Sequence, residues 1–122
     1  MYAKLFVEKV KEHNANCWLV NTGWVGEPYG KGKRIPIAYS RAIVRSIIKG
    51  TLDRGEFRKD PEFGIMVPKT CEGVPAEVLD PLNGASDKGG YMERAKALAL
   101  SFKKNFKQFE GDVTGEVLHS MP

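Results

Sequence analysis

Residues 21–40 read NTGWVGEPYGKGKRIPIAYS, a stretch rich in glycine and basic residues. It contains four glycines and the basic cluster Lys31, Lys33 and Arg34. An apolar run at residues 17–20 precedes it, and an apolar pattern with helical spacing at residues 40–49 follows it. Glycine lets a backbone approach a ligand closely, and lysine and arginine bind anions. A strand, a basic glycine-rich loop and a helix are together typical of a nucleotide site.

The stretch contains no standard phosphate-binding motif. It is not a P-loop, because no glycine lies five residues before either Gly–Lys pair and neither Lys31 nor Lys33 is followed by Ser or Thr. The pattern GxGxxG is also absent from it. A long surface loop with solvated charges is therefore an alternative to a nucleotide site.

Segments along most of the chain resemble, in order and spacing, the C-terminal part of ATP-dependent phosphoenolpyruvate carboxykinase. The central segments are residues 21–24 (NTGW) and 30–35 (GKGKRI). Supporting segments are residues 2–3, 18–20, 41–43, 60–61, 73–75, 87–88 and 102–109. The resemblance extends from about Tyr2 to Glu110. It indicates the ATP-using class rather than the GTP-using class, whose nucleotide loop reads differently.

The resemblance implies a carboxy-lyase of gluconeogenesis. That family transfers the γ-phosphoryl group of ATP to oxaloacetate with loss of CO2, giving phosphoenolpyruvate and ADP, and requires Mg2+ and Mn2+. Its P-loop, metal ligands and oxaloacetate-binding arginines lie upstream of the part that this chain resembles. We therefore expect no catalytic and no metal-binding residue here, and an inactive isolated segment. The expected partners are ATP and the remainder of the carboxykinase chain.

Three residues on the adenine side of the family's ATP site correspond to Arg34, Ile35 and Ser40. Arg34 matches an arginine whose guanidinium lies against the base, and a planar cation suits stacking on a π-face. Ile35 matches an apolar contact to the same base. Ser40 stands where many members have threonine, so a hydroxyl is kept and a methyl is lost. Glu27 replaces a common glycine and is expected to point to solvent, whereas Trp24 is interpreted as a packing anchor.

The composition is typical of one soluble globular domain. The chain has 122 residues, of which 42% are hydrophobic and 28% charged. No apolar run approaches the roughly 20 residues that span a bilayer, and no signal peptide is visible. We expect a cytoplasmic protein without membrane contact. Cys17 and Cys71, far apart in the sequence, are expected to be free thiols rather than metal ligands.

The net charge of +4 is unevenly distributed. Residues 1–60 hold twelve Lys and Arg against six Asp and Glu, and residues 61–122 hold seven against nine. A basic half suits nucleotide phosphates or nucleic acid. A nucleic-acid-binding protein would need exposed aromatics, whereas Phe102, Phe106 and Phe109 have core spacing, so no nucleic acid is expected. A non-catalytic nucleotide-binding or scaffold fragment is a further alternative.

The periodicity predicts an α/β fold, or α+β if the segment is taken alone, with short mixed strands packed by three helices. Helices are expected at residues 2–14, 41–49 and 87–110, with Ser40 and Asp87 as N-caps and Gly50 as a stop. Strands are expected at residues 17–20, 34–38, 56–59 and 65–67, with a turn at residues 60–63. Residues 73–86 should be irregular apart from one helical turn at residues 76–79.

The chain is expected to divide into a carboxykinase segment, residues 1–110, and a flexible tail, residues 111–122. On the last helix Tyr91, Ala95, Leu98 and the phenylalanines at 102, 106 and 109 form one apolar stripe, which we interpret as core. The strands should join a larger sheet of the complete enzyme. Taken alone, the segment would expose strand edges and apolar surface, so we expect it to self-associate.

Overall fold

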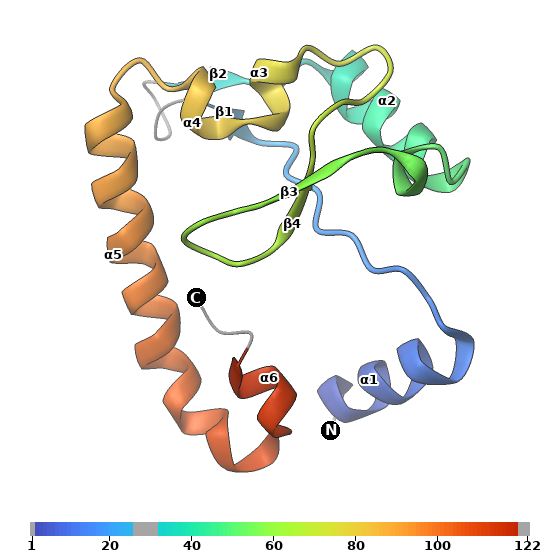
Figure 1. Cartoon of the computed structure of the whole chain (residues 1–122), viewed down its shortest axis with the longest axis vertical. Coiled ribbons are helices and arrows are strands. Elements are labelled where there is room, and N and C mark those ends of the chain that lie inside the picture. Colours follow the sequence, from blue (N-terminus) through green and yellow to red (C-terminus); the bar gives the residue numbers. More distant parts are fainter. Residues whose placement is uncertain (1, 26–31, 120–122) are drawn as a thin grey trace.

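The computed structural model describes residues 2–25 and 32–119, and Figure 1 shows their arrangement. The predicted mixture of helices and short strands is confirmed. The α-helices are α1 (Tyr2–His13), α2 (Ile37–Ile48), α3 (Ala76–Leu79), α4 (Pro81–Gly84), α5 (Lys88–Phe106) and α6 (Gly115–His119). The 3-10 turns are η1 (Leu52–Arg54) and η2 (Lys107–Asp112). The strands are β1 (Trp24–Val25), β2 (Lys33–Arg34), β3 (Phe57–Lys59) and β4 (Met66–Pro68).

Within the described residues the strands form two separate antiparallel ribbons, β1–β2 and β3–β4. The predicted hairpin that contains β3 and β4 is confirmed, and so is its turn. The Asp60 carboxylate accepts hydrogen bonds from the backbone N–H groups of Glu62 (3.0 Å) and Phe63 (2.8 Å). Gly64 has φ +69°, which a residue with a side chain rarely adopts. Local turn chemistry therefore fixes this hairpin.

Two of the predicted strands are wrong or too long. Residues 17–20, all described, are irregular, and Trp18 packs its ring 6.0 Å from that of Phe57 instead of joining a sheet. The strand predicted at residues 34–38 is reduced to β2. Pro36 (φ −56°, ψ 139°) is the N-cap of α2, so Ser40 lies inside the first turns of this helix and is not its cap. Proline has no N–H for a strand ladder and suits a helix start.

The sequence predicted the helix ends better than it predicted the strands. Gly50 has φ +67° and follows the last turn of α2, as expected for a helix stop. Asp87 caps α5 by accepting a hydrogen bond of 2.9 Å from the Gly90 N–H. The predicted helix at residues 87–110 ends early as an α-helix, because η2 replaces its last part. Residues 115–119 of the expected flexible tail form α6, whereas the division at Glu110 stays a prediction.

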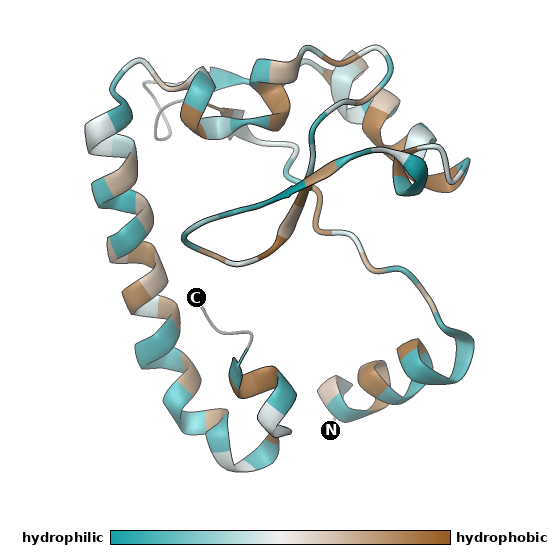
Figure 2. Cartoon of the chain, viewed as in Figure 1, coloured by the Kyte–Doolittle hydropathy of each residue, from teal (hydrophilic) through white to brown (hydrophobic). Residues whose placement is uncertain are grey.

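The buried core is small. Its apolar members are Ile35, Leu52, Cys71, Ala85, Ala95 and Ala99, and among the described residues no large side chain is completely buried. The chain exposes 9460 Å2, whereas a compact folded protein of its mass exposes about 6,600 Å2. Figure 2 shows apolar segments along α1 and α5, two helices that stand at the edges of the molecule. No helix in the part described has both the length and the apolar character needed to cross a membrane.

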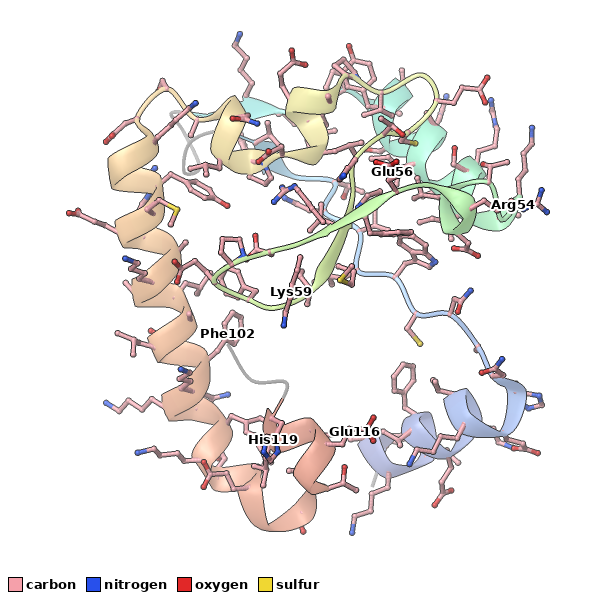
Figure 3. All side chains as sticks on the ribbon, in the orientation of Figure 1. Arg54, Glu56, Lys59, Phe102, Glu116 and His119 are labelled. Atoms are coloured by element: carbon pink, nitrogen blue, oxygen red, sulfur yellow. The ribbon has the colours of Figure 1, made fainter. Side chains whose placement is uncertain are left out.

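The apolar stripe of α5 is only partly the core that we predicted: Ala95 is buried, and Tyr91 and Phe106 are half-buried. Phe102 and Phe109 remain 53% and 46% exposed, and Leu98 is 50% exposed. Phe102 points from α5 towards the β3–β4 hairpin, where its ring meets Phe63 edge-on at 6.2 Å (Figure 3). The small residues Ala95 and Ala99 are the buried positions of α5. The periodicity correctly marks an apolar face, but this chain supplies little to cover it.

Candidate functional site

The β1–β2 ribbon places Arg34 directly opposite Trp24. The Ile35 N–H donates to the Gly23 carbonyl at 2.8 Å, which makes residues 23 and 35 a hydrogen-bonded pair of the ladder. The next pair, Trp24 and Arg34, is therefore a non-hydrogen-bonded pair, where side chains come closest in an antiparallel ribbon. Both residues are exposed, with Trp24 at 36%. An aromatic ring and a planar cation thus share the outer face of this ribbon.

Asn21 fixes the entry into the ribbon. Its Oδ1 accepts a hydrogen bond of 2.9 Å from the Gly23 N–H, and its Nδ2 donates to the Trp24 carbonyl at 3.4 Å. This is an Asx turn, in which a side chain replaces a backbone partner. Asn21 therefore has a structural role, and the backbone that carries Trp24 is held on both sides.

The inner face of the ribbon packs on the rest of the protein. Ile35 is 6% exposed, and Val25 is half-buried. A β-carbon added to Gly84 in α4 would lie 3.8 Å from Val25 Cγ1, so α4 lies directly against β1. The same added atom would lie 2.9 Å from the Glu77 carbonyl oxygen. Gly84 therefore allows α4, α3 and the ribbon to approach closely.

The three predicted adenine-side residues follow one another from β2 into α2. Arg34 is exposed, Ile35 is buried, and Ser40 is half-buried on α2, one turn after the Pro36 cap. Since Ile35 faces the protein interior, it offers a ligand very little surface in this arrangement. Gly30 and Lys31 of the predicted loop, and Glu27, lie outside the described residues.

Ser40 also lies at the rim of an open hollow of about 670 Å3 along α2. The hollow is lined by Ser40, Arg41, Val44, Arg45, Ile48 and Lys49. Ile48 is 79% exposed, whereas Ile43 and Ile47 are half-buried. One side of α2 is therefore apolar along its length and bordered by three cations.

A polar junction that the sequence did not reveal joins β3, α4 and α5. Arg58 Nη2 lies 3.1 Å from Asp80 Oδ1, with both side chains about three-quarters buried. Asp80 is also the N-cap of α4, accepting hydrogen bonds from the N–H groups of Leu82 and Asn83. Burial raises the pKa of the Tyr91 hydroxyl beside this junction, and Asp60 and Asp80 raise it further, whereas Arg58 lowers it. The Asp80–Pro81 pair was the available sequence signal for α4.

The described residues do not form a metal centre. No group of three or more His, Cys, Asp or Glu side chains comes together in residues 2–25 and 32–119. Among these residues there is therefore no clustered set of side chains that could by itself hold Mg2+ or Mn2+. Both cysteines are free thiols; Cys17 is exposed, and Cys71 is buried with its Sγ 3.6 Å from Ser46 Oγ.

Comparisons with known proteins agree with the resemblance found in the sequence. The family described as phosphoenolpyruvate carboxykinase matches residues 1–77. Phosphoenolpyruvate carboxykinase (ATP) of Geobacter metallireducens is 52% identical over 121 residues, which are 99% of this chain and 23% of that protein. The protein of the same name from Geotalea uraniireducens is 50% identical over 117 residues, which are 96% of this chain and 22% of that protein. This chain thus spans less than a quarter of the length of these relatives. It belongs to the phosphoenolpyruvate carboxykinase family, in the ATP-dependent class.

Proposed function

We propose that this chain is a C-terminal segment of an ATP-dependent phosphoenolpyruvate carboxykinase and forms the adenine-side wall of its ATP site. The complete enzyme would convert oxaloacetate and ATP into phosphoenolpyruvate, ADP and CO2, in the cytoplasm and in gluconeogenesis. The names of the relatives, which carry the term ATP, support this reaction. The single observation in the structure that supports the site is the exposed Arg34 at the end of a ribbon anchored on its other face.

Arg34 has the chemistry that an adenine ring requires. Its guanidinium is planar and permanently charged, so it can stack on the π-face of a base and attract it electrostatically. Its backbone is held by the β1 ladder and by the buried Ile35 that follows. In this proposal Ile35 anchors the ribbon beside Arg34 through its buried side chain, and only the small exposed part of Ile35 contacts the base. Ser40 would offer its hydroxyl from the first turns of α2.

The remainder of the carboxykinase chain is the proposed partner for the exposed apolar surface. The relatives are more than four times longer than this chain, which leaves ample sequence to cover α1, α5 and the hollow along α2. That remainder would also supply the phosphate cradle and the ligands of Mg2+ and Mn2+, which the described residues do not provide. Phe102 and Phe109 are exposed near lysines of α5 and η2, an arrangement that nucleic-acid-binding proteins also use. Family membership favours the carboxykinase partner.

The test uses a full-length carboxykinase in which residues 1–122 replace the matching segment of the Geobacter metallireducens relative, called the chimaera below. We expect Arg34→Ala to weaken ATP binding by about two- to thirty-fold, the range of a cation–π contact. Oxaloacetate affinity should stay unchanged, and Arg34→Lys should not restore ATP binding because an ammonium has no planar face. Titration calorimetry with each ligand measures both affinities.

Lys33 provides the matched control for this experiment. It is the exposed cation next to Arg34 on β2, and strand alternation places it on the other face of the ribbon. Lys33→Ala removes the same charge from the same ribbon without removing a planar stacking group, so it should weaken ATP binding less than Arg34→Ala does. If Arg34→Ala had no effect, or if it matched Lys33→Ala, the adenine-side role of the ribbon would be wrong.

A further inference from the structure

We propose that α2 binds an acidic, amphipathic helix from the remainder of the carboxykinase chain. The surface concerned, called the docking face below, is made of three exposed apolar residues and the three cations beside them, Ile37, Val44, Ile48, Arg41, Arg45 and Lys49. The inference rests on the proposed function, because it needs this chain to be one part of a longer enzyme. It adds the chemical class of the segment that covers α2.

Helix α2 carries apolar residues on two opposite sides. One side packs on this chain, where Ser46 is buried with its Oγ 3.6 Å from Cys71 Sγ, and Ile47 is half-buried. With about 3.6 residues per turn, Val44 and Ile48 lie on the other side, where they are 42% and 79% exposed. A helix that is apolar all round is normally buried all round. The docking face therefore has the character of a surface that another element covers.

The cations of the docking face have no acidic partner in the described part of the chain. Arg41, Arg45 and Lys49 are exposed, and none of them forms an ion pair within residues 2–25 and 32–119. They follow one another at intervals of four residues, a spacing at which like charges destabilise a helix. Carboxylates placed opposite them would offset this repulsion. Charge complementarity thus favours an occupant that carries Asp or Glu at the same spacing.

The shape of this surface suits a helix. Two rows of side chains run along the hollow on α2, one made of Ser40, Val44 and Ile48 and the other of Arg41, Arg45 and Lys49. Rows at four-residue intervals are the ridges between which a row of a second helix packs. The hollow has a volume of about 670 Å3, and α2 stands at one edge of the molecule (Figure 1). A helix with an apolar row beside an acidic row therefore matches the docking face in shape and in charge.

The remainder of the carboxykinase chain is the favoured source of this helix. The relatives are more than four times longer than this chain, so they contain many further segments. A second copy of this chain carries the same net charge of +4, which opposes its approach to three unpaired cations. Because Ser40 lies at the rim of the same hollow, the docked helix would also border the proposed adenine site.

Site-specific photocrosslinking in the chimaera identifies the occupant. A photoreactive diazirine analogue of lysine is placed at position 49, and the crosslinked peptides are identified by mass spectrometry. We expect a crosslink inside one chain, to a segment outside residues 1–122 in which Asp or Glu recurs at helical spacing beside apolar residues. The same analogue at position 104, an exposed lysine of α5, is the control and should not label that segment.

Charge reversal tests the complementarity. We expect Arg41→Glu combined with Arg45→Glu to raise the hydrogen-exchange rates of α2 amides in the chimaera by about ten-fold, since like charges would then face each other across the interface. On an uncovered helix the same change removes like-charge pairs and should not speed exchange. The matching reversal of Lys103 and Lys107, two exposed cations four residues apart, should leave α2 unchanged. Lysine in place of the acidic residues of the crosslinked segment should restore slow exchange.

The outcomes separate this inference from the ATP-site proposal. A crosslink between two copies, the absence of any crosslink, or a crosslinked segment without acidic residues would each overturn it, and so would unchanged exchange after charge reversal. If the charge-reversed chimaera does not fold, Arg41→Gln with Arg45→Gln replaces it and should speed exchange less. Unchanged ATP affinity in Arg34→Ala would instead overturn the adenine-side role, whatever covers α2.

Discussion

Arg58 and Asp80 form an ion pair of 3.1 Å that connects the β3–β4 hairpin to the start of α4. The Asp80 carboxylate also caps α4, and α4 supports β1 through the close approach of Gly84 to Val25. One carboxylate thus links the hairpin to the ribbon that carries Arg34. Because the Asp80 carboxylate makes both the cap hydrogen bonds and the ion pair, its removal should lower the stability of more than one element.

We predict that Asp80→Ala lowers the local stability of α4 and the β3–β4 hairpin by about 1–3 kcal/mol, the sum of a lost N-cap and a lost partly buried ion pair. Asp80→Asn keeps an oxygen for the cap and should cost less. Hydrogen exchange of the α4 and β3 amides in the chimaera measures this local opening. Glu56→Ala is the control, since the Glu56–Lys69 pair is largely exposed and should contribute little. Equal exchange in all three variants would contradict the linking role of Asp80.

The second prediction concerns alkaline pH and Tyr91. Burial first, and then Asp60 and Asp80, raise the pKa of Tyr91 above its ordinary value near 10. The folded state therefore keeps this proton longer than the unfolded state. The resulting stability is fully present below pH 10 and is lost as the pH rises through the folded-state pKa. The free energy of unfolding of the chimaera, measured between pH 8 and 11.5, should fall more steeply with rising pH when Tyr91 is present than in the Tyr91→Phe variant. Parallel curves would show that Tyr91 titrates normally.

Features with a local chemical cause could be predicted from the sequence, and features with a distant cause could not. Asp60 makes its turn, Gly50 ends α2, and Asp87 begins α5 through groups only a few residues away. The sequence of this segment does not show what covers the apolar residues at 17–20 or the apolar stripe through Phe102. Apolar character indicates that a surface will be covered, but not by which element.

The candidate site shows the same division. Arg34, Ile35 and Ser40 could be named because residues 30–35 resemble a known family, whereas their exposure depends on how the ribbon packs. Ile35 directly follows the two-residue strand β2 and lies on the face that packs on the protein. The sequence did not define so short a strand. The pairing of Trp24 with Arg34 depends on a register set across a ten-residue separation. Nothing in the local pattern specifies that register.

The third prediction uses Gly84 to test the support of the ribbon. A methyl group there would lie 2.9 Å from the backbone oxygen of Glu77, which cannot move without shifting α3. We expect Gly84→Ala to destabilise the chimaera by about 1–3 kcal/mol, the usual cost of overpacking. It should also weaken ATP binding, because α4 lies against β1. Gly111→Ala is the control, since nothing lies within 4 Å of the added atom. Thermal unfolding and calorimetry with ATP measure the two effects, and a neutral Gly84→Ala would show that α4 can adjust.

The last prediction is that the isolated 122-residue chain self-associates. Its exposed surface of 9460 Å2 exceeds that of a compact protein of this mass by roughly 2,900 Å2, more than the 1,200–2,000 Å2 that a stable interface buries. Part of the excess is apolar, including Phe6, Leu98 and Phe102, which are 61%, 50% and 53% exposed. Light scattering over a concentration series should therefore show a mass that rises with concentration. Phe102→Ser should reduce the association, whereas the same change at the exposed Lys104 should not. A strict monomer at every concentration would mean that these faces are stable in water by themselves, and that the remainder of the carboxykinase chain is not needed to cover them.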